Sequence, residues 1–279
     1  MNQILDIITA KAEKMEEIVR HAGEVMKSNS PTAGAVHVKG GIANFVTDFD
    51  IRIQKYLIDE LSRMFPGCGF FGEEETGGND HNTASDLCFF IDPIDGTTNY
   101  IFGYHHSCVS VGVSSEGRMI AGFVYNPYVD EFFSALQGNG AFLNGQRLHV
   151  LDRSLEEGIV AYGCARYNEG DTDALFQITK ELYLNSLSLR NGGSAALDLC
   201  RIASGSNVAY LELKLQPYDY AAASVIIREA GGIIGQLDGP EVSLDKPCSI
   251  LAGTPKAVEQ VKQLCRKFAL LHPQNMRPW

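Results

Sequence analysis

The residue run 87–91, Leu-Cys-Phe-Phe-Ile, is apolar throughout and leads directly into an acidic segment at residues 92–99. A strand with one face in water alternates apolar and polar residues, so an apolar run of this length indicates a strand buried on both faces. Such a strand requires further layers of structure on both sides of its sheet. The 279 residues of the chain are enough to build them, as one large domain or as two smaller ones in close contact.

Apolar periodicity predicts a different arrangement in each half of the chain. The first half is expected to form helices at about 3–28 and 48–64, a loop or hairpin at 37–44 between them, and then short strands as in an antiparallel meander. The second half alternates strands and helices and ends in a helix at 254–271 with Thr254 as N-cap. The other expected elements are strands at 70–71, 87–91, 108–114, 119–125, 131–136, 158–162, 187–190, 208–213, 233–236 and 249–252, and helices at 172–184, 194–203 and 218–230.

This change of pattern predicts two regions with a soft boundary near residue 150. Residues 1–150 are expected to form an N-terminal α+β region with an antiparallel sheet. Residues 151–279 are expected to form a C-terminal α/β region that completes whatever site the first region begins.

Composition and charge narrow the cellular setting and the partners. The formal net charge is −11 and no run of Lys and Arg interrupts it, which argues against a basic face for nucleic acid. No stretch reaches the roughly 18 to 20 apolar residues that a membrane helix needs, and residues 1–29 lack the pattern of a signal peptide. Seven scattered cysteines without a Cys-x-x-Cys pair fit a reducing compartment. We therefore expect a cytoplasmic protein that binds neither nucleic acid nor membrane.

Carboxylates gather in three segments, at expected strand ends or helix starts. They are Glu73 to Glu75 after an aromatic strand, Asp92 and Asp95 after the buried strand, and Asp219 at the start of a helix. Placing two aspartates at the end of a buried strand is costly unless something neutralises them. Mg²⁺ suits such an oxygen-rich site, because it binds a few carboxylates and keeps several waters.

The residues that follow the two aspartates indicate a phosphate ligand. Gly96, Thr97 and Thr98 are expected to open a helix, whose N–H groups and dipole favour an anion. Metal ligands beside such a helix start are what metal-assisted hydrolysis of a phosphate ester needs. The same cations would offset the net charge of −11, which would otherwise repel a phosphate substrate. A small phosphorylated metabolite is therefore the expected substrate.

The sequence resembles the inositol monophosphatase family in four ordered motifs. The family signature, a hydrophobic strand followed by Asp-Pro-(Ile/Leu)-Asp-Gly-Thr-x-Asn, is matched at 91–99 without departure. The Gly-Glu-Glu of the family is matched at 72–74, its Val-Thr-x-x-Asp segment at 46–50, and its aromatic-Asp-x-Ala-Ala helix start at 218–222. The match covers nearly the whole chain.

The resemblance implies a layered αβαβα sandwich of the sugar-phosphatase type, with two or three Mg²⁺ ions per site. It implies that Glu73, Asp92 and the carbonyl of Ile94 hold one cation, and that Asp92, Asp95 and Asp219 hold another. The catalytic residues that it implies are Asp50, Thr97 and Glu73, and the implied substrate contacts are Asp95, Gly96, Thr97, Ser194, Ala195 and Glu212. Inhibition by lithium and a homodimer are further expectations from the family.

Several of the acidic residues also have a purely structural explanation. Thr47 and Asp50 have the spacing of a capping box before an apolar helix, so Asp50 could serve the helix alone. Asp219 could likewise cap the helix that it begins. Glu74 and Glu75 are expected to be solvated surface.

Two histidines, His105 and His106, follow the signature closely. Histidine is the usual acid or base at neutral pH, but a site whose metal ions activate water does not require one. We expect both side chains at most at the rim of the substrate site.

The leading functional hypothesis is an inositol-1-phosphate phosphatase, a Mg²⁺-dependent phosphomonoester hydrolase. Activity on fructose 1,6-bisphosphate or 3′-phosphoadenosine 5′-phosphate is the main alternative, because fold and metal ligands do not fix the leaving group. A non-catalytic regulatory protein on the same fold is a third hypothesis. Such a protein would have no reason to keep Glu73, Asp92, Asp95 and Asp219 together.

Overall fold

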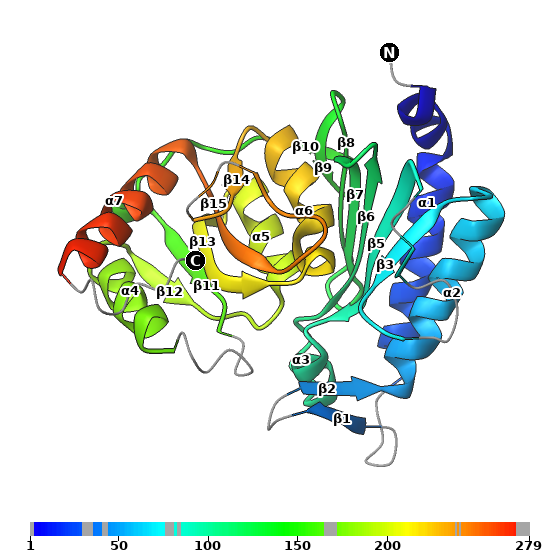
Figure 1. Cartoon of the computed structure of the whole chain (residues 1–279), viewed down its shortest axis with the longest axis horizontal. Helices are drawn as coiled ribbons and strands as arrows, with labels where there is room; N and C mark the ends of the chain where they lie inside the picture. The colour runs from blue at the N-terminus through cyan, green and yellow to red at the C-terminus, as the bar shows by residue number, and fades with distance from the viewer. Residues whose placement is uncertain are drawn as a thin grey trace.

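The computed structural model of the chain describes residues 3–29, 36–40, 44–75, 81–82, 85–164, 172–237, 239 and 241–271. Across these residues five layers follow one another: a helix pair, a sheet, a second helix pair, a second sheet and a third helix pair (Figure 1). The αβαβα sandwich expected from the family resemblance is therefore confirmed.

The first layer consists of α1 (Gln3–Lys27) and α2 (Asp48–Met64), which cover one face of the larger sheet (Figure 1). Both helices bury an apolar face, represented by Met15 and Val19 in α1 and by Ile53 and Leu57 in α2. An antiparallel hairpin of β1 (Val36–Gly40) and β2 (Asn44–Thr47) precedes α2. The last residue of this hairpin, Thr47, is the N-cap of α2.

The larger sheet has eight strands in the order β10-β9-β8-β7-β6-β5-β3-β4, and it is antiparallel except for the pair β3 and β5. A short helix, α3 (Thr97–Ile101), follows β5. The strands are β3 (Gly69–Gly72), β4 (His81–Asn82), β5 (Leu87–Asp95), β6 (Cys108–Ser115), β7 (Arg118–Asn126), β8 (Glu131–Leu136), β9 (Gly140–Leu143) and β10 (Gln146–Leu148).

The second half of the chain supplies the remaining three layers. Helices α5 (Ala195–Ala203) and α6 (Pro217–Glu229) lie between the two sheets (Figure 1). The second sheet has the order β12-β11-β13-β15-β14, and α4 (Thr172–Leu184) and α7 (Pro255–Leu271) cover its outer face. Its strands are β11 (Ile159–Tyr162), β12 (Ser188–Arg190), β13 (Asn207–Leu215), β14 (Ile233–Gly235) and β15 (Cys248–Gly253), and a short 3-10 helix (Leu155–Glu157) precedes them.

Strand β5 is buried on both faces, as its apolar run predicted. Phe89 and Ile91 belong to the apolar core beneath α1 and α2, whereas Cys88 and Phe90 belong to the core that includes residues of α5 and α6. The expected end of this strand at Ile91 is wrong, because β5 continues to Asp95.

The extra length of β5 contains a β-bulge that explains how two aspartates share one site. Asp92 pairs with Ser110 of β6 and Asp95 with Cys108, so three steps along β5 match two along β6. In a regular strand residues three apart face opposite sides, and the additional residue brings both aspartates to the same side. Ile94 packs into the opposite core, beneath α1 and α2.

Helix α6 lies unusually close to the larger sheet. Gly112 of β6 and Gly122 of β7 are paired in register, and both face this helix. A Cβ on Gly122 would lie 2.1 Å from the carbonyl oxygen of Ala222, and one on Gly112 would lie 2.8 Å from the Cβ of Ala221. The missing side chains therefore set the distance between the sheet and the helix that carries Asp219.

The division of the chain into regions 1–150 and 151–279 stays a prediction. The larger sheet lies within residues 69–148 and the second sheet within residues 159–253, on either side of the expected boundary near residue 150. In the described part of the chain, no helix combines the length and the apolar character needed to cross a membrane.

We predict that Gly122→Ala lowers the free energy of unfolding by about 2 to 3 kcal/mol, because the new methyl group would overlap the backbone of α6. Denaturation with urea measures the change. Gly239→Ala is the matched control, since its Cβ would have no contact closer than 3.7 Å and should change stability by less than about 0.5 kcal/mol. Equal stability of the two variants would contradict the close packing.

Candidate functional site

Four acidic residues from three segments meet where β5 ends. Glu73 follows β3, Asp92 and Asp95 lie in the last part of β5, and Asp219 lies in the first turn of α6. Asp92, Asp95 and Asp219 are only 2%, 7% and 9% exposed, and Glu73 is half-buried. The N–H of Glu73 donates to the carbonyl of Ile91 at 3.0 Å, which fixes the segment after β3 beside β5.

The charges of these residues disfavour one another. Burial raises the pKa of Asp92 well above its usual range, and the neighbouring charges of Glu73, Asp95 and Asp219 raise it further. Burial also raises the pKa of Asp219, to which Asp95 and Glu73 add. Among the described residues, no Lys or Arg forms an ion pair with Asp92, Asp95 or Asp219.

Asp95 is held by the start of α5. Its carboxylate accepts hydrogen bonds from the Ser194 hydroxyl at 2.5 Å, from the Ala196 N–H at 2.7 Å and from the Ala195 N–H at 3.2 Å. Burial raises the pKa of Asp95 to about 6, and these hydrogen bonds act against that rise. Ser194 and Ala195 are thus engaged with Asp95 in this structure, and their contact with a substrate stays a prediction.

Asp92 and Asp219 make local backbone contacts as well. Asp92 Oδ1 accepts from the N–H of Ile94 at 3.1 Å. Asp219 Oδ2 accepts from the N–H of Gln216 at 2.8 Å, in a capping box at the start of α6. Asp219 therefore caps the start of α6 and also belongs to the acidic cluster.

Asp50 also combines a cap with a place at the site. Its Oδ2 accepts from the N–H of Thr47 at 2.8 Å and from the Thr47 hydroxyl at 2.5 Å, which completes the expected capping box of α2. Its Oδ1 lies 3.4 Å from the Thr97 hydroxyl, which donates to the carbonyl of Ile94 at 3.1 Å. A chain of polar contacts thus connects Asp50 with the end of β5.

Gly96 forms the turn between β5 and α3. It is the N-cap of α3 with φ of +89°, a left-handed conformation that favours glycine. A Cβ there would also lie 3.0 Å from the carbonyl oxygens of Gly193 and His106. The turn is therefore enclosed by two loops that are distant in the sequence.

Glu212 lies on β13, at the side of the site formed by the second sheet. It is buried, and the Tyr210 hydroxyl donates to its Oε2 at 2.5 Å. A Cβ on Gly163 would lie 1.8 Å from the same oxygen, so a larger residue there would displace the Glu212 carboxylate. The charge of Glu212 is among those that raise the pKa of Asp219.

The expectation that Glu74 is solvated surface is wrong, whereas Glu75 is exposed. The Gln54 amide donates to the Glu74 carbonyl at 2.5 Å and accepts from the Glu74 N–H at 2.9 Å. Gln54 is fully buried one turn after Asp50 in α2. Gln54 reaches the Glu74 backbone because α2 packs against the segment after β3. The sequence pattern does not specify that packing.

The donor atoms of the cluster fit a hard divalent cation. They are carboxylate oxygens, and those of Asp92, Asp95 and Asp219 belong to groups with a raised pKa. The Ser110 hydroxyl opposite Asp92 is fully buried without a hydrogen-bond partner among the described residues. Within the described part of the chain, however, no three Asp, Glu, His or Cys side chains already surround one point as ligands. The carboxylates accept backbone N–H groups instead, and small side-chain rotations would redirect them.

Comparison with known proteins gives a consistent result. The family model described as "Inositol monophosphatase family" matches residues 9–268. Inositol monophosphatase 2 of Solanum lycopersicum is 34% identical over 88% of this chain and 91% of its own, and the Nus factor SuhB of Escherichia coli K12 is 35% identical over 86% and 90%. The crystal structure of the SuhB extragenic suppressor protein of Bartonella henselae superposes with a TM-score of 0.84 at 31% identity, covering 92% of this chain and 99% of that one.

We predict that Asp92→Asn makes the metal-free protein more stable. A raised pKa in the folded state means that the ionised carboxylate destabilises the fold at neutral pH, so a neutral amide of the same shape should raise the free energy of unfolding. Thermal unfolding in excess EDTA measures this change. Asp86→Asn, the same exchange at an exposed residue just before β5, should have almost no effect; a loss of stability in Asp92→Asn would refute the repulsion.

Proposed function

The chain belongs to the inositol monophosphatase family, and from that membership we propose that it is a Mg²⁺-dependent phosphomonoester hydrolase. The observation that carries this proposal is the burial of Asp92, Asp95 and Asp219 at one point, where burial raises the pKa of each carboxyl group. Two or three Mg²⁺ ions bound there would supply the positive charge that the carboxylates and the phosphate both require. The proposed ligands are Glu73, Asp92, the carbonyl of Ile94, Asp95 and Asp219.

The proposed reaction is attack of water on phosphorus, with cleavage of the P–O ester bond and release of an alcohol and inorganic phosphate. Asp50 and Thr97 lie together beside the end of β5, so we assign to them the orientation of the attacking water and the acceptance of its proton. Glu73, which follows the neighbouring strand β3, completes this catalytic set. The turn at Gly96 and the N–H groups that follow it would contact the phosphate.

Inositol 1-phosphate is the proposed substrate. Glu212, buried at the edge of the site, supplies an acceptor for a polyol hydroxyl. Structures of a Staphylococcus aureus inositol monophosphatase with inositol monophosphate and with 2′-AMP superpose with TM-scores of 0.76 and 0.77 at 28% identity. This neighbour binds both a polyol phosphate and a nucleotide, so fructose 1,6-bisphosphate and 3′-phosphoadenosine 5′-phosphate remain the alternatives.

A regulatory role is the second candidate function. It is favoured by relatives at 35% identity that are named Nus factor SuhB. The two roles are compatible in one protein, because the acidic cluster occupies the interior and leaves the outer surface for partners. A cytoplasmic location and a homodimer are further parts of the proposal.

We predict that phosphate release from inositol 1-phosphate depends on Mg²⁺ and stops in excess EDTA. Assaying this substrate, fructose 1,6-bisphosphate, 3′-phosphoadenosine 5′-phosphate and 2′-AMP side by side ranks the substrates by kcat/KM. Equal turnover with EDTA and with Mg²⁺ would remove the metal from the mechanism. A higher kcat/KM for one of the other three would replace the proposed substrate.

Asp92→Asn should lower kcat/KM at least about 1,000-fold, because the amide cannot supply the negative charge of a metal ligand. Asp92 is a cleaner test than Asp95, whose three hydrogen bonds to Ser194, Ala195 and Ala196 would also be lost in an Asp95→Ala variant. Unchanged activity of Asp92→Asn, with a normal circular dichroism spectrum, would exclude Asp92 as a ligand.

Thr97→Val should lower kcat about 100-fold, because it removes the hydroxyl that lies between Asp50 and the Ile94 carbonyl. Thr97→Ser should restore most of the rate. The neighbouring exposed Thr98 offers the matched control, and Thr98→Val should keep the wild-type kcat. If Thr97→Val is as active as Thr98→Val, the hydroxyl has no part in catalysis.

A further inference from the structure

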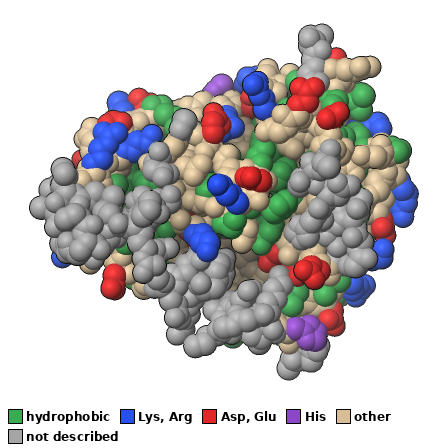
Figure 2. Space-filling model, viewed as in Figure 1, with side chains coloured by type: hydrophobic (Ala, Val, Ile, Leu, Met, Phe, Trp, Pro, Cys, Tyr) green, Lys and Arg blue, Asp and Glu red, His purple; other side chains and the backbone are tan. Residues whose placement is uncertain are grey.

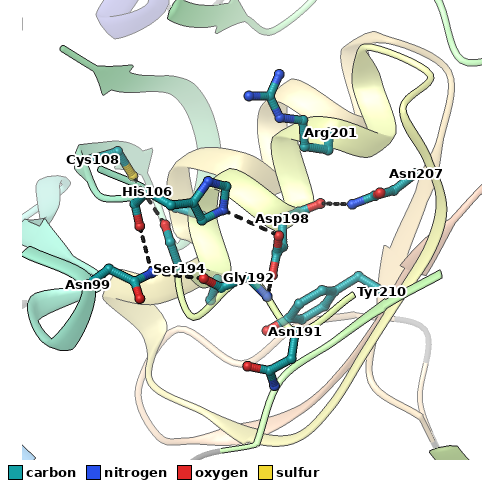
Figure 3. A network of polar contacts seen from close by, with 12 residues as sticks. Asn99, His106, Cys108, Asn191, Gly192, Ser194, Asp198, Arg201, Asn207 and Tyr210 are labelled. Carbon is teal, nitrogen blue, oxygen red and sulfur yellow. Dashed lines mark hydrogen bonds and ion pairs between the residues drawn. The ribbon is translucent and has the colours of Figure 1, made fainter. Parts of the chain in front are cut away.

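Gly192 is held through both of its backbone groups (Figure 3). Its carbonyl accepts from the Asn99 side-chain amide at 2.8 Å, and its N–H donates to Asp198 Oδ2 at 3.1 Å. A Cβ at this position would lie 2.3 Å from Asp198 Oδ1, so a side chain here would displace the Asp198 carboxylate. These contacts fix the backbone immediately before Ser194.

The two holding residues come from opposite sides of the site. Asn99 lies in α3, directly after β5 of the larger sheet, whereas Asp198 lies in α5 and is only 5% exposed. The Asn99 amide also donates to the carbonyl of His106 at 2.8 Å, and His106 Nε2 lies 3.6 Å from Asp198 Oδ1 (Figure 3). Asn99 therefore connects the loop before β6 with the loop before α5, and the side chain of His106 lies beside α5 itself.

The loop before α5 determines where Asp95 is held. The Ser194 hydroxyl and the N–H groups of Ala195 and Ala196 are all donors to the Asp95 carboxylate. Any shift of the backbone at Gly192 would move Ser194, which is two residues away, and with it the start of α5. The orientation of Asp95 thus depends on contacts that do not touch Asp95.

We propose that Asn99 and Asp198 are positioning residues, which hold Gly192 and thereby orient Asp95 in the Mg²⁺ site. This inference rests on the proposed function, because it assigns Asp95 a role toward Mg²⁺. The hydrogen bond from Gly192 requires an acceptor at residue 198 but no charge. Asparagine should therefore replace Asp198, and alanine should not.

The test is Mg²⁺ binding to the metal-free full-length protein, measured by isothermal titration calorimetry and independent of turnover. Asp198→Ala and Asn99→Ala should each weaken Mg²⁺ binding about ten-fold, the usual effect of losing a residue that orients a ligand. The half-saturating Mg²⁺ concentration for hydrolysis should rise by a similar factor. Asp198→Asn should stay within about two-fold of wild type. The double variant should be no more than about two-fold weaker than the weaker single variant, since both act on one peptide.

Glu229→Ala is the matched control. The Glu229 carboxylate accepts from the N–H groups of Gly138 and Gly140 at 2.9 and 2.8 Å, at the end of α6 opposite Asp219. The Glu229→Ala substitution removes a similar contact between a carboxylate and glycine N–H groups. It should therefore lower the unfolding temperature without changing Mg²⁺ binding. A purely structural role of Asp198 would make Asp198→Ala behave in the same way, which would overturn the proposal.

Two further outcomes would also contradict it. Asp198→Asn binding Mg²⁺ as weakly as Asp198→Ala would show that charge, not the bond to Gly192, is what matters. Fully additive effects in the double variant would show that the two residues act separately. If Asp198→Ala does not fold, Asn99→Ser takes its place in the comparison with Glu229→Ala. A wild-type protein that binds no Mg²⁺ would overturn the proposed function itself, an outcome distinct from a variant that binds like wild type.

Discussion

Repulsion among buried carboxylates at the end of β5 is the constraint on which the rest of the structure depends. Asp92, Asp95 and Asp219 have raised pKa values because burial and the neighbouring charges disfavour ionisation. The starts of α5 and α6 offset part of this cost, since their N–H groups donate to Asp95 and Asp219. These hydrogen bonds also fix the starts of the two central helices. The negative charge that they do not compensate favours the binding of a cation.

Backbone details bring the carboxylates together. The β-bulge turns Asp92 and Asp95 to one side of β5, and Ile94 to the other. The glycines at 112 and 122 let α6 approach the larger sheet and place Asp219 near the same point. These two glycines do not contact the acidic cluster, yet their positions accept no larger residue. A single added methyl group would push α6 away from β6 and β7.

The sequence predicts those features that depend on local pattern. The burial of β5 on both faces follows from its lack of alternation, and the capping box of Thr47 and Asp50 follows from spacing. The end of β5 was misplaced because the bulge depends on register with β6, which no local signal encodes. The burial of Glu74 and the contacts of Gly192 were missed for the same reason, since their partners Gln54 and Asn99 are distant in the sequence.

The central claim is that the acidic cluster exists to hold divalent cations, and anomalous diffraction from crystals grown with Mn²⁺ tests it most directly. Mn²⁺ prefers the same carboxylate and water ligands as Mg²⁺ and scatters anomalously. The claim predicts at least two anomalous peaks in contact with the carboxylates of Glu73, Asp92, Asp95 and Asp219. Crystals of active protein that show no peak at these residues, with Mn²⁺ bound elsewhere or not at all, would contradict it.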